Sequence, residues 1–118
     1  MKKKHLKAQK ANVLGLLKLI MENPDLPIVP VVDTELVASD EFAWWIGSWG
    51  KASIEEIYQD DERVYIRSRD EEMLIDQALY WLEDKAATEE EAYELAKKEV
   101  DGYDWKKVIA VWIGLPVI

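Results

Sequence analysis

The spacing of apolar positions predicts three helices. One apolar stripe recurs at intervals of three and four residues and comprises Val13, Leu14, Leu17, Ile20 and Met21. This spacing predicts a helix over about residues 6–22 with the stripe on its buried face. Helical patterns also cover about 70–84 and 88–101, and both begin with acidic residues, which the positive end of a helix dipole favours. Thr88 followed by Glu91 is a capping-box sequence at the start of the last helix.

Alternating or continuous apolar runs predict strands in the rest of the chain. These runs lie at 26–32, 41–48, 53–59, 63–68 and 107–113. Pro27 and Pro30 cannot donate backbone hydrogen bonds, so the first run is expected at a sheet edge. The three middle runs predict an antiparallel meander with turns at 47–50 and 60–62. The last run is apolar throughout, so we expect it at the centre of the sheet or beside an early strand.

Together these elements predict a single α+β domain over residues 1–118. Its expected architecture is an antiparallel sheet of four to five strands, with the N-terminal helix and the later helix pair packed against it. A chain of 118 residues suffices for one domain, and 49% apolar residues is too many for a disordered chain. Lysines oppose the helix dipole at an N-terminus, so the lysine-rich start at 1–10 is expected to fray or to dock on an acidic surface of another copy.

The charge is unevenly distributed and bears on the choice of partner. The net charge of −9 divides into +5 for residues 1–10 and −14 for the remainder. An acidic body repels phosphates, so no direct binding to nucleic acid is expected, although an array of carboxylates could mimic nucleic acid. Lysines interrupt the apolar part of the first 22 residues, and no run approaches the ~20 apolar residues of a membrane span. We therefore expect a cytoplasmic protein that does not bind membranes.

The residue types present leave little catalytic chemistry. The absence of cysteine excludes disulfides, a thiolate nucleophile and cysteine-ligated zinc, and His5 is the single histidine. None of the serines lies in a Gly-x-Ser-x-Gly elbow. The sequence therefore predicts no catalytic residue, metal or cofactor, and a protein that is not an enzyme. A metal-dependent hydrolase built from clustered carboxylates remains the alternative from the enzyme class.

Aromatic residues provide the most distinctive local pattern. Three of the six tryptophans fall within 44–49, and adjacent Trp44 and Trp45 would point to opposite faces of a strand. Packing in the core and recognition of a partner both remain open for this segment. Our binding hypothesis places anchors at Trp45 and Trp49, because tryptophan dominates interface hot spots. The charged rim of this hypothesis consists of Asp60, Asp61 and Glu62.

The same acidic run also fits a solvated turn or a set of metal ligands. The favoured function is a non-enzymatic acidic binding protein that engages a protein partner through an aromatic patch and an acidic rim. A self-associating structural component, including a homodimer, is the remaining alternative.

Three segments carry a resemblance: Asn23–Asp33, Phe42–Gly50 and Tyr103–Ile113. In these segments the chain is similar to small uncharacterised proteins encoded in phages and prophages of Gram-positive bacteria. The likeness extends over most of the chain from Glu22 onward and includes no catalytic motif. It implies a phage-associated accessory protein of unknown role. Because genes in that setting often encode small acidic inhibitors of host defence, it also favours an inhibitor or a nucleic-acid mimic.

Overall fold

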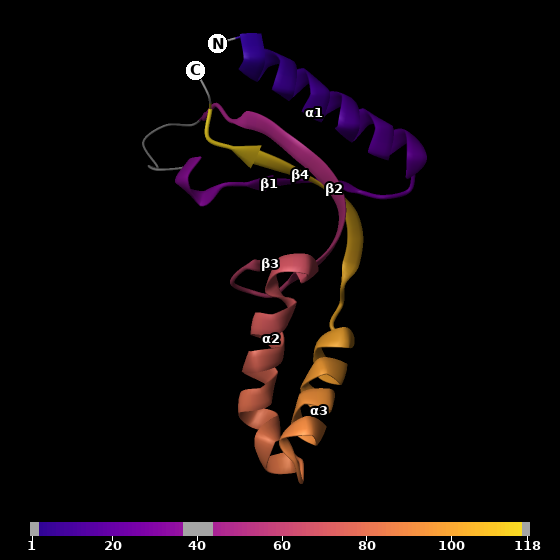
Figure 1. Ribbon diagram of the computed structural model, residues 1–118, viewed down its shortest axis with the longest axis vertical. Coiled ribbons are helices and arrows are strands. Elements are labelled where there is room, and N and C mark those ends of the chain that lie inside the picture. The colour runs from indigo at the N-terminus through magenta and orange to yellow at the C-terminus, as the bar shows by residue number, and fades with distance from the viewer. Residues whose placement is uncertain (1–2, 37–43, 117–118) are drawn as a thin grey trace. The chain divides into compact units, whose positions relative to one another are not determined.

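The protein has an α+β fold, as predicted from its sequence (Figure 1). The structure is a computed structural model that describes residues 3–36 and 44–116. In chain order the elements are α1 (Lys3–Glu22), β1 (Ile28–Val32), the 3-10 helix η1 (Thr34–Leu36), β2 (Ser48–Gln59), β3 (Val64–Ile66), α2 (Arg67–Leu82), the 3-10 helix η2 (Glu83–Lys85), α3 (Glu89–Asp101) and β4 (Lys106–Gly114). The strands pair in the order β1-β4-β2-β3.

The chain divides into two compact units. Unit 1 comprises residues 1–54 and 107–118, and unit 2 comprises residues 55–106. Unit 1 contains α1, β1, most of β4 and the first half of β2. Unit 2 contains the end of β2, β3, α2 and α3. The single domain predicted over 1–118 stays a prediction.

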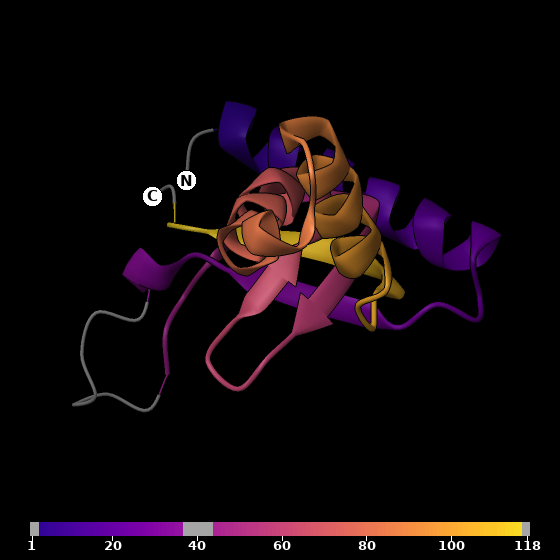
Figure 2. The same cartoon turned by 90° about the horizontal axis from the view of Figure 1, so that it is seen from below.

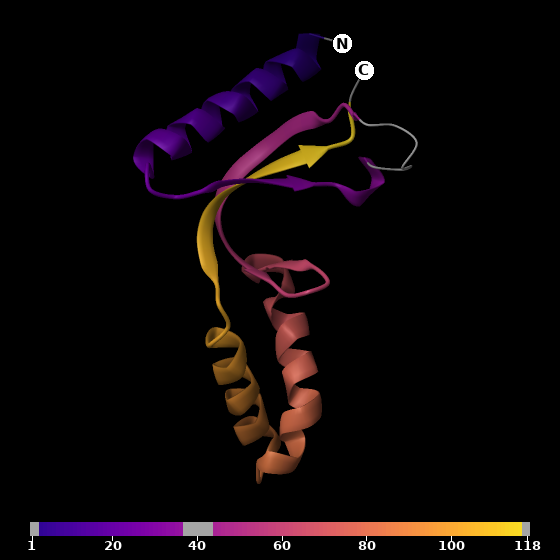
Figure 3. The same ribbon diagram turned by 180° about the vertical axis from the view of Figure 1, so that it is seen from behind.

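The sheet is mixed, so the prediction of a purely antiparallel sheet is wrong. β1 pairs with β4 in parallel, in a register that runs from Ile28–Ile109 to Val32–Ile113. β4 and β2 run in opposite directions (Figures 1 and 3). A parallel pair needs a long connection, and β2, β3, α2 and α3 all lie between β1 and β4 in the chain. The edge position of β1 and the inner position of β4 confirm what the prolines and the apolar run predicted.

Helix α1 lies along one face of the strands of unit 1 (Figures 1 and 3). Its buried side chain, Leu16, forms a core cluster with Ile109 and Val111 of β4, and Leu19 and Ile20 pack against this cluster. The sheet therefore covers Leu16, Leu19 and Ile20, of which Ile20 belongs to the predicted stripe and Leu16 and Leu19 do not.

The stripe predicted to be buried is largely exposed. Leu14 is 65% exposed and Met21 81%, and Leu17 lies between them on the open side of the helix. Helix α1 carries two apolar stripes on different faces, and a single sheet can cover only one of them. The second stripe of α1, formed by Leu14, Leu17 and Met21, is therefore available to solvent.

Strand β2 is longer than predicted, because the expected turn at 47–50 does not form. β2 runs without interruption from Ser48 to Gln59. A Cβ atom at Gly50 would lie 2.6 Å from the backbone carbonyl oxygen of Trp112. Glycine therefore serves the close approach of β2 to β4 and not a turn. Residues 44–47 have no regular structure, and the first part of the predicted strand, 41–43 with Phe42, lies outside the described residues.

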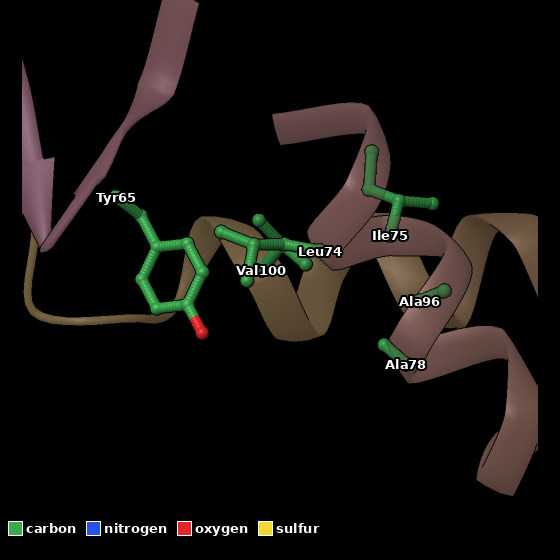
Figure 4. Packing of buried hydrophobic residues seen from close by; sticks show 6 residues of the cluster. All are labelled: Tyr65, Leu74, Ile75, Ala78, Ala96 and Val100. Atoms are coloured by element: carbon green, nitrogen blue, oxygen red, sulfur yellow. The ribbon is translucent and has the colours of Figure 1, made fainter. Parts of the chain in front are cut away.

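In unit 2, α2 and α3 form an antiparallel pair that packs on the β2–β3 hairpin (Figures 1 and 2). The two helices meet at small residues, since Ala78 of α2 and Ala96 of α3 are both fully buried. Figure 4 shows the cluster around them, with the ring of Tyr65 directed toward Val100 and Leu74. The cluster consists of Tyr65, Leu74, Ile75, Ala78, Ala96 and Val100.

Local hydrogen bonds set the starts of both helices of unit 2. The backbone N–H of Ile66 donates to Oδ2 of Asp70 at 2.8 Å, so α2 begins at Arg67 and ends the predicted strand early. At α3 the capping prediction is confirmed, because the N–H of Glu91 donates to Oγ1 of Thr88 at 3.1 Å. The Glu91 carboxylate in turn accepts from the N–H of Ala87.

Candidate functional site

The aromatic segment of unit 1 lies largely at the surface. Trp44 is 90% exposed, Trp45 is also exposed, and Trp49 is 45% exposed at the start of β2. Since residues 44–47 are not a strand, the predicted alternation of faces does not apply to Trp44 and Trp45. Both predicted anchors, Trp45 and Trp49, therefore belong to unit 1 and present side-chain area to solvent.

The side chain of Trp49 lines a shallow groove beside α1, which we call the α1 groove. The groove has a volume of about 410 Å³ and is lined by Leu6, Gln9, Lys10, Val13, Leu14 and Trp49. An adjoining depression of about 440 Å³ shares Leu6, Lys10 and Leu14 with it and adds Lys3, Lys7 and Ala11. The uncovered apolar stripe of α1 and a predicted anchor thus form one apolar surface.

A backbone contact holds Trp49 against α1. Nδ2 of Asn12 donates a hydrogen bond of 3.0 Å to the backbone carbonyl oxygen of Trp49. On the other side of β2, Gly50 lies close to Trp112 of β4. The backbone of Trp49 is therefore held beside α1 by Asn12, and the adjacent Gly50 lies against β4.

Lysines surround the apolar part of this surface. Helix α1 has no acidic residue before Glu22, and within the described ranges no carboxylate forms an ion pair with Lys3, Lys7 or Lys10. Unit 1 carries eight basic and six acidic residues, a net +2, whereas unit 2 carries seven basic and 18 acidic residues, a net −11. The charge available to the α1 groove is therefore positive.

The predicted acidic rim belongs to unit 2, and its first member holds a turn. Oδ1 of Asp60 accepts hydrogen bonds from the N–H groups of Glu62 and Arg63, both at 2.8 Å, and Oδ2 accepts from the Tyr65 hydroxyl at 3.0 Å. The hydrogen bonds from the Arg63 and Glu62 N–H groups lower the pKa of Asp60. Asp61 and Glu62 are exposed at the tip of this turn.

The phenol of Tyr65 responds to the same contact. Burial of Tyr65 and its hydrogen bond to Asp60 both raise the pKa of the phenol. The carboxylate of Asp60 thus accepts hydrogen bonds that form the β2–β3 turn. Asp61 and Glu62 are the members of the predicted rim that can contact a partner.

Sequence reasoning missed a charged cluster centred on Arg67. Nε of Arg67 donates to Oε2 of Glu71 at 3.2 Å, Nη1 lies 3.5 Å from Oε2 of Glu56, and Nη2 contacts Oδ1 of Asp101. The guanidinium carbon lies 5.1 Å from the ring centre of Trp105. These contacts join β2, α2 and α3 through one side chain.

Opposing effects act on the Arg67 guanidinium. Burial acts to lower its pKa, but the hydrogen bond to Glu71 and the surrounding carboxylates outweigh this effect and raise it. The i,i+4 spacing of Arg67 and Glu71 is visible in the sequence, whereas nothing in the sequence points to Asp101, 34 residues away. Chemically, the cluster is a closed set of ion pairs that stabilises unit 2.

The described residues contain neither a metal-binding cluster nor a membrane-spanning helix. Between residues 3 and 36 and between 44 and 116, no three histidine or acidic side chains are grouped so that they could hold a metal ion. None of the helices in these ranges has the length and apolar character needed to cross a membrane.

Comparison of the chain with protein-family models, with curated proteins and with solved structures gives no match.

Proposed function

We propose that the protein is a non-enzymatic binding protein whose α1 groove engages a partner protein. The observation that carries this proposal is the second apolar stripe of α1, which lies exposed beside Trp49 and is edged by lysines. A partner segment that offers apolar side chains flanked by carboxylates has the matching chemistry.

The energetics favour covering this surface. Burial of one large aliphatic side chain contributes roughly 1.5–3 kcal/mol, and Leu6, Leu14 and Leu17 are all between 45% and 65% exposed. Tryptophan dominates interface hot spots, and the backbone of Trp49 is held beside α1 by its hydrogen bond with Asn12. In this proposal Trp49 is the anchor, and Trp45 is a flanking contact.

The charged rim of the binding surface is basic in this proposal, whereas the sequence predicted an acidic one. The sequence suggested Asp60, Asp61 and Glu62, but the hydrogen bonds of Asp60 are made within its own turn. The charges around the α1 groove are those of Lys3, Lys7 and Lys10. The resemblance to phage-encoded proteins favours a host or phage protein as the partner.

No observation in the described residues favours the hydrolase alternative. Glu56, Glu71 and Asp101 form ion pairs with Arg67, and Asp70 accepts a hydrogen bond from the N–H of Ile66, so these four carboxylates have structural roles in unit 2.

Capture from bacterial lysate by three immobilised full-length proteins tests the proposal. Leu14→Asp places a charge in the groove, and Leu115→Asp makes the same change at a comparably exposed leucine that does not line it. We expect wild type and Leu115→Asp to retain the same proteins and Leu14→Asp to lose them, with circular dichroism unchanged in all three. Identical capture by all three proteins would contradict the proposal.

A further inference from the structure

The α2–α3 pair of unit 2 presents a second exposed aromatic surface. Tyr80 is 85% exposed and Trp81 58% in the last turn of α2, and Tyr93 and Leu95 of α3 are also exposed. Neither Tyr80 nor Trp81 belongs to the core cluster of this unit or packs against it. These aromatic side chains are therefore available for contact without loss of the helix-pair core.

Acidic residues are frequent in the same part of the chain. Between residues 80 and 95 the chain carries six acidic residues and one lysine. The acidic residues are Glu83, Asp84, Glu89, Glu90, Glu91 and Glu94. We call this part of the chain, residues 80–95, the acidic tip.

The acidic tip is held in a defined shape. The capping contact between Thr88 and Glu91 fixes the start of α3, and the buried pair Ala78 and Ala96 joins the two helices directly beside it. A preformed surface binds with less loss of conformational entropy than a flexible one.

The α1 groove has the opposite charge. Residues 3–21 carry five lysines and no acidic residue, and Leu14 and Trp49 are among the apolar residues that line the groove. We propose that the α1 groove of one copy binds the acidic tip of a second copy, with Trp81 and Tyr80 against the groove and carboxylates against the lysines. This inference rests on the proposed function and names its partner.

The surfaces in this contact are different, so the contact is heterologous. A heterologous contact leaves one free groove and one free tip on each pair of copies, so association continues into a ring or a chain of copies. Charge complementarity makes the association sensitive to salt.

An anionic lipid surface is the other class of partner for a lysine-bearing amphipathic helix. Helices that lie on membranes place their lysines on the face opposite the apolar one. In α1, Lys7 and Lys10 line the same depression as Leu6 and Leu14, and the groove includes Trp49 from β2. This arrangement suits a shaped protein surface better than a flat lipid layer.

Sedimentation velocity of full-length protein tests the inference with two complementary variants. Leu14→Asp disables the groove and leaves the tip intact, whereas Tyr80→Ala with Trp81→Ala disables the tip and leaves the groove intact. We expect wild type to associate with rising concentration and to dissociate with added salt. Each variant alone should associate more weakly by a factor on the order of ten or more. An equimolar mixture of the two should form a heterodimer and nothing larger, because one intact groove meets one intact tip.

A wild type that stays monomeric at every concentration, or a mixture that stays monomeric, would overturn the inference. Binding of the monomer to phosphatidylglycerol vesicles, with loss on Leu14→Asp, would overturn it in favour of a lipid surface. If wild type is monomeric but Leu14→Asp still loses captured lysate proteins, the second-copy inference fails while the proposed function stands.

Discussion

Asn12 of α1 donates a hydrogen bond from Nδ2 to the backbone carbonyl oxygen of Trp49 in β2, at 3.0 Å. This contact couples the helix with the uncovered apolar stripe to the tryptophan that lines the same groove. It joins residues 37 positions apart in the chain, so it also ties α1 to the sheet.

Removal of this hydrogen bond should change the surroundings of Trp49 and lower the stability of the fold only slightly. Asn12→Ala is expected to lower the free energy of unfolding by about 1 kcal/mol, the usual contribution of one hydrogen bond. The indole fluorescence of Trp49 should become more solvent-like. Urea unfolding and fluorescence of a variant that retains Trp49 as its only tryptophan would measure both effects. An unchanged emission spectrum would show that Asn12 does not position Trp49.

Because β2 approaches β4 closely at Gly50, replacement of this glycine by alanine should destabilise the protein, whereas the same replacement at Gly15 should not. Gly50→Ala places a methyl group 2.6 Å from a carbonyl oxygen and should lower the free energy of unfolding by roughly 1–3 kcal/mol. Gly15→Ala is the matched control, because nothing lies within 4 Å of its added Cβ. In the interior of α1 this control should stabilise the protein by about 1 kcal/mol. Equal effects of the two substitutions would contradict the β2–β4 packing.

Loss of the Arg67 side chain should lower the free energy of unfolding by more than loss of a single surface ion pair would. Arg67→Met leaves Glu56, Glu71 and Asp101 as neighbouring carboxylates without a cation and should lower the free energy of unfolding by roughly 1–3 kcal/mol. Arg67→Lys keeps the charge but lacks the planar fork, so it should restore only part of the loss.

Lys97→Met removes the same charge from an exposed position of α3 and serves as the control for Arg67→Met. Its effect should stay within about 0.5 kcal/mol. Chemical denaturation at low ionic strength compares the three variants, and a loss at Lys97 as large as at Arg67 would rule out a special role for the cluster.

Asp60 predicts a dependence of stability on acid pH. Its pKa is lowered in the folded state by the hydrogen bonds from the Arg63 and Glu62 N–H groups. The contribution of Asp60 is therefore complete above its unfolded pKa of about 3.9 and is lost as the pH falls through the lower folded value. In Asp60→Asn this part of the acid dependence should disappear, whereas in Asp61→Asn it should persist. Thermal melts between neutral and acid pH would show this, and parallel curves for wild type and Asp60→Asn would contradict it.

Local chemistry made much of the fold predictable. The two prolines before and within β1 restrict it to an edge, and the uniform apolar run of β4 requires an inner position. The capping sequence of α3 needs no information beyond four neighbouring residues, and it forms as predicted.

Features set by distant residues were not predictable in the same way. Spacing alone could not decide which apolar stripe of α1 is buried, because Leu16 and Leu14 are both part of a plausible face. The turn expected at 47–50 is absent because Gly50 instead lies within strand β2, close to the backbone of Trp112. Trp112 is 62 positions further along the chain. Trp49 was predicted as an anchor from the run of tryptophans at 44–49. The lysine of α1 that lines the same groove could not be predicted, because it lies near Trp49 only once β2 is placed beside the helix.

Photo-crosslinking from position 14 tests most directly whether the α1 groove is a binding surface. A photoreactive phenylalanine analogue replaces Leu14 in the full-length protein, and the same analogue replaces Leu115 in the control. We expect a protein adduct from position 14 and none from position 115. If the partner is a second copy, the adduct maps to residues 80–95. No adduct from position 14 above the level at position 115 would contradict it.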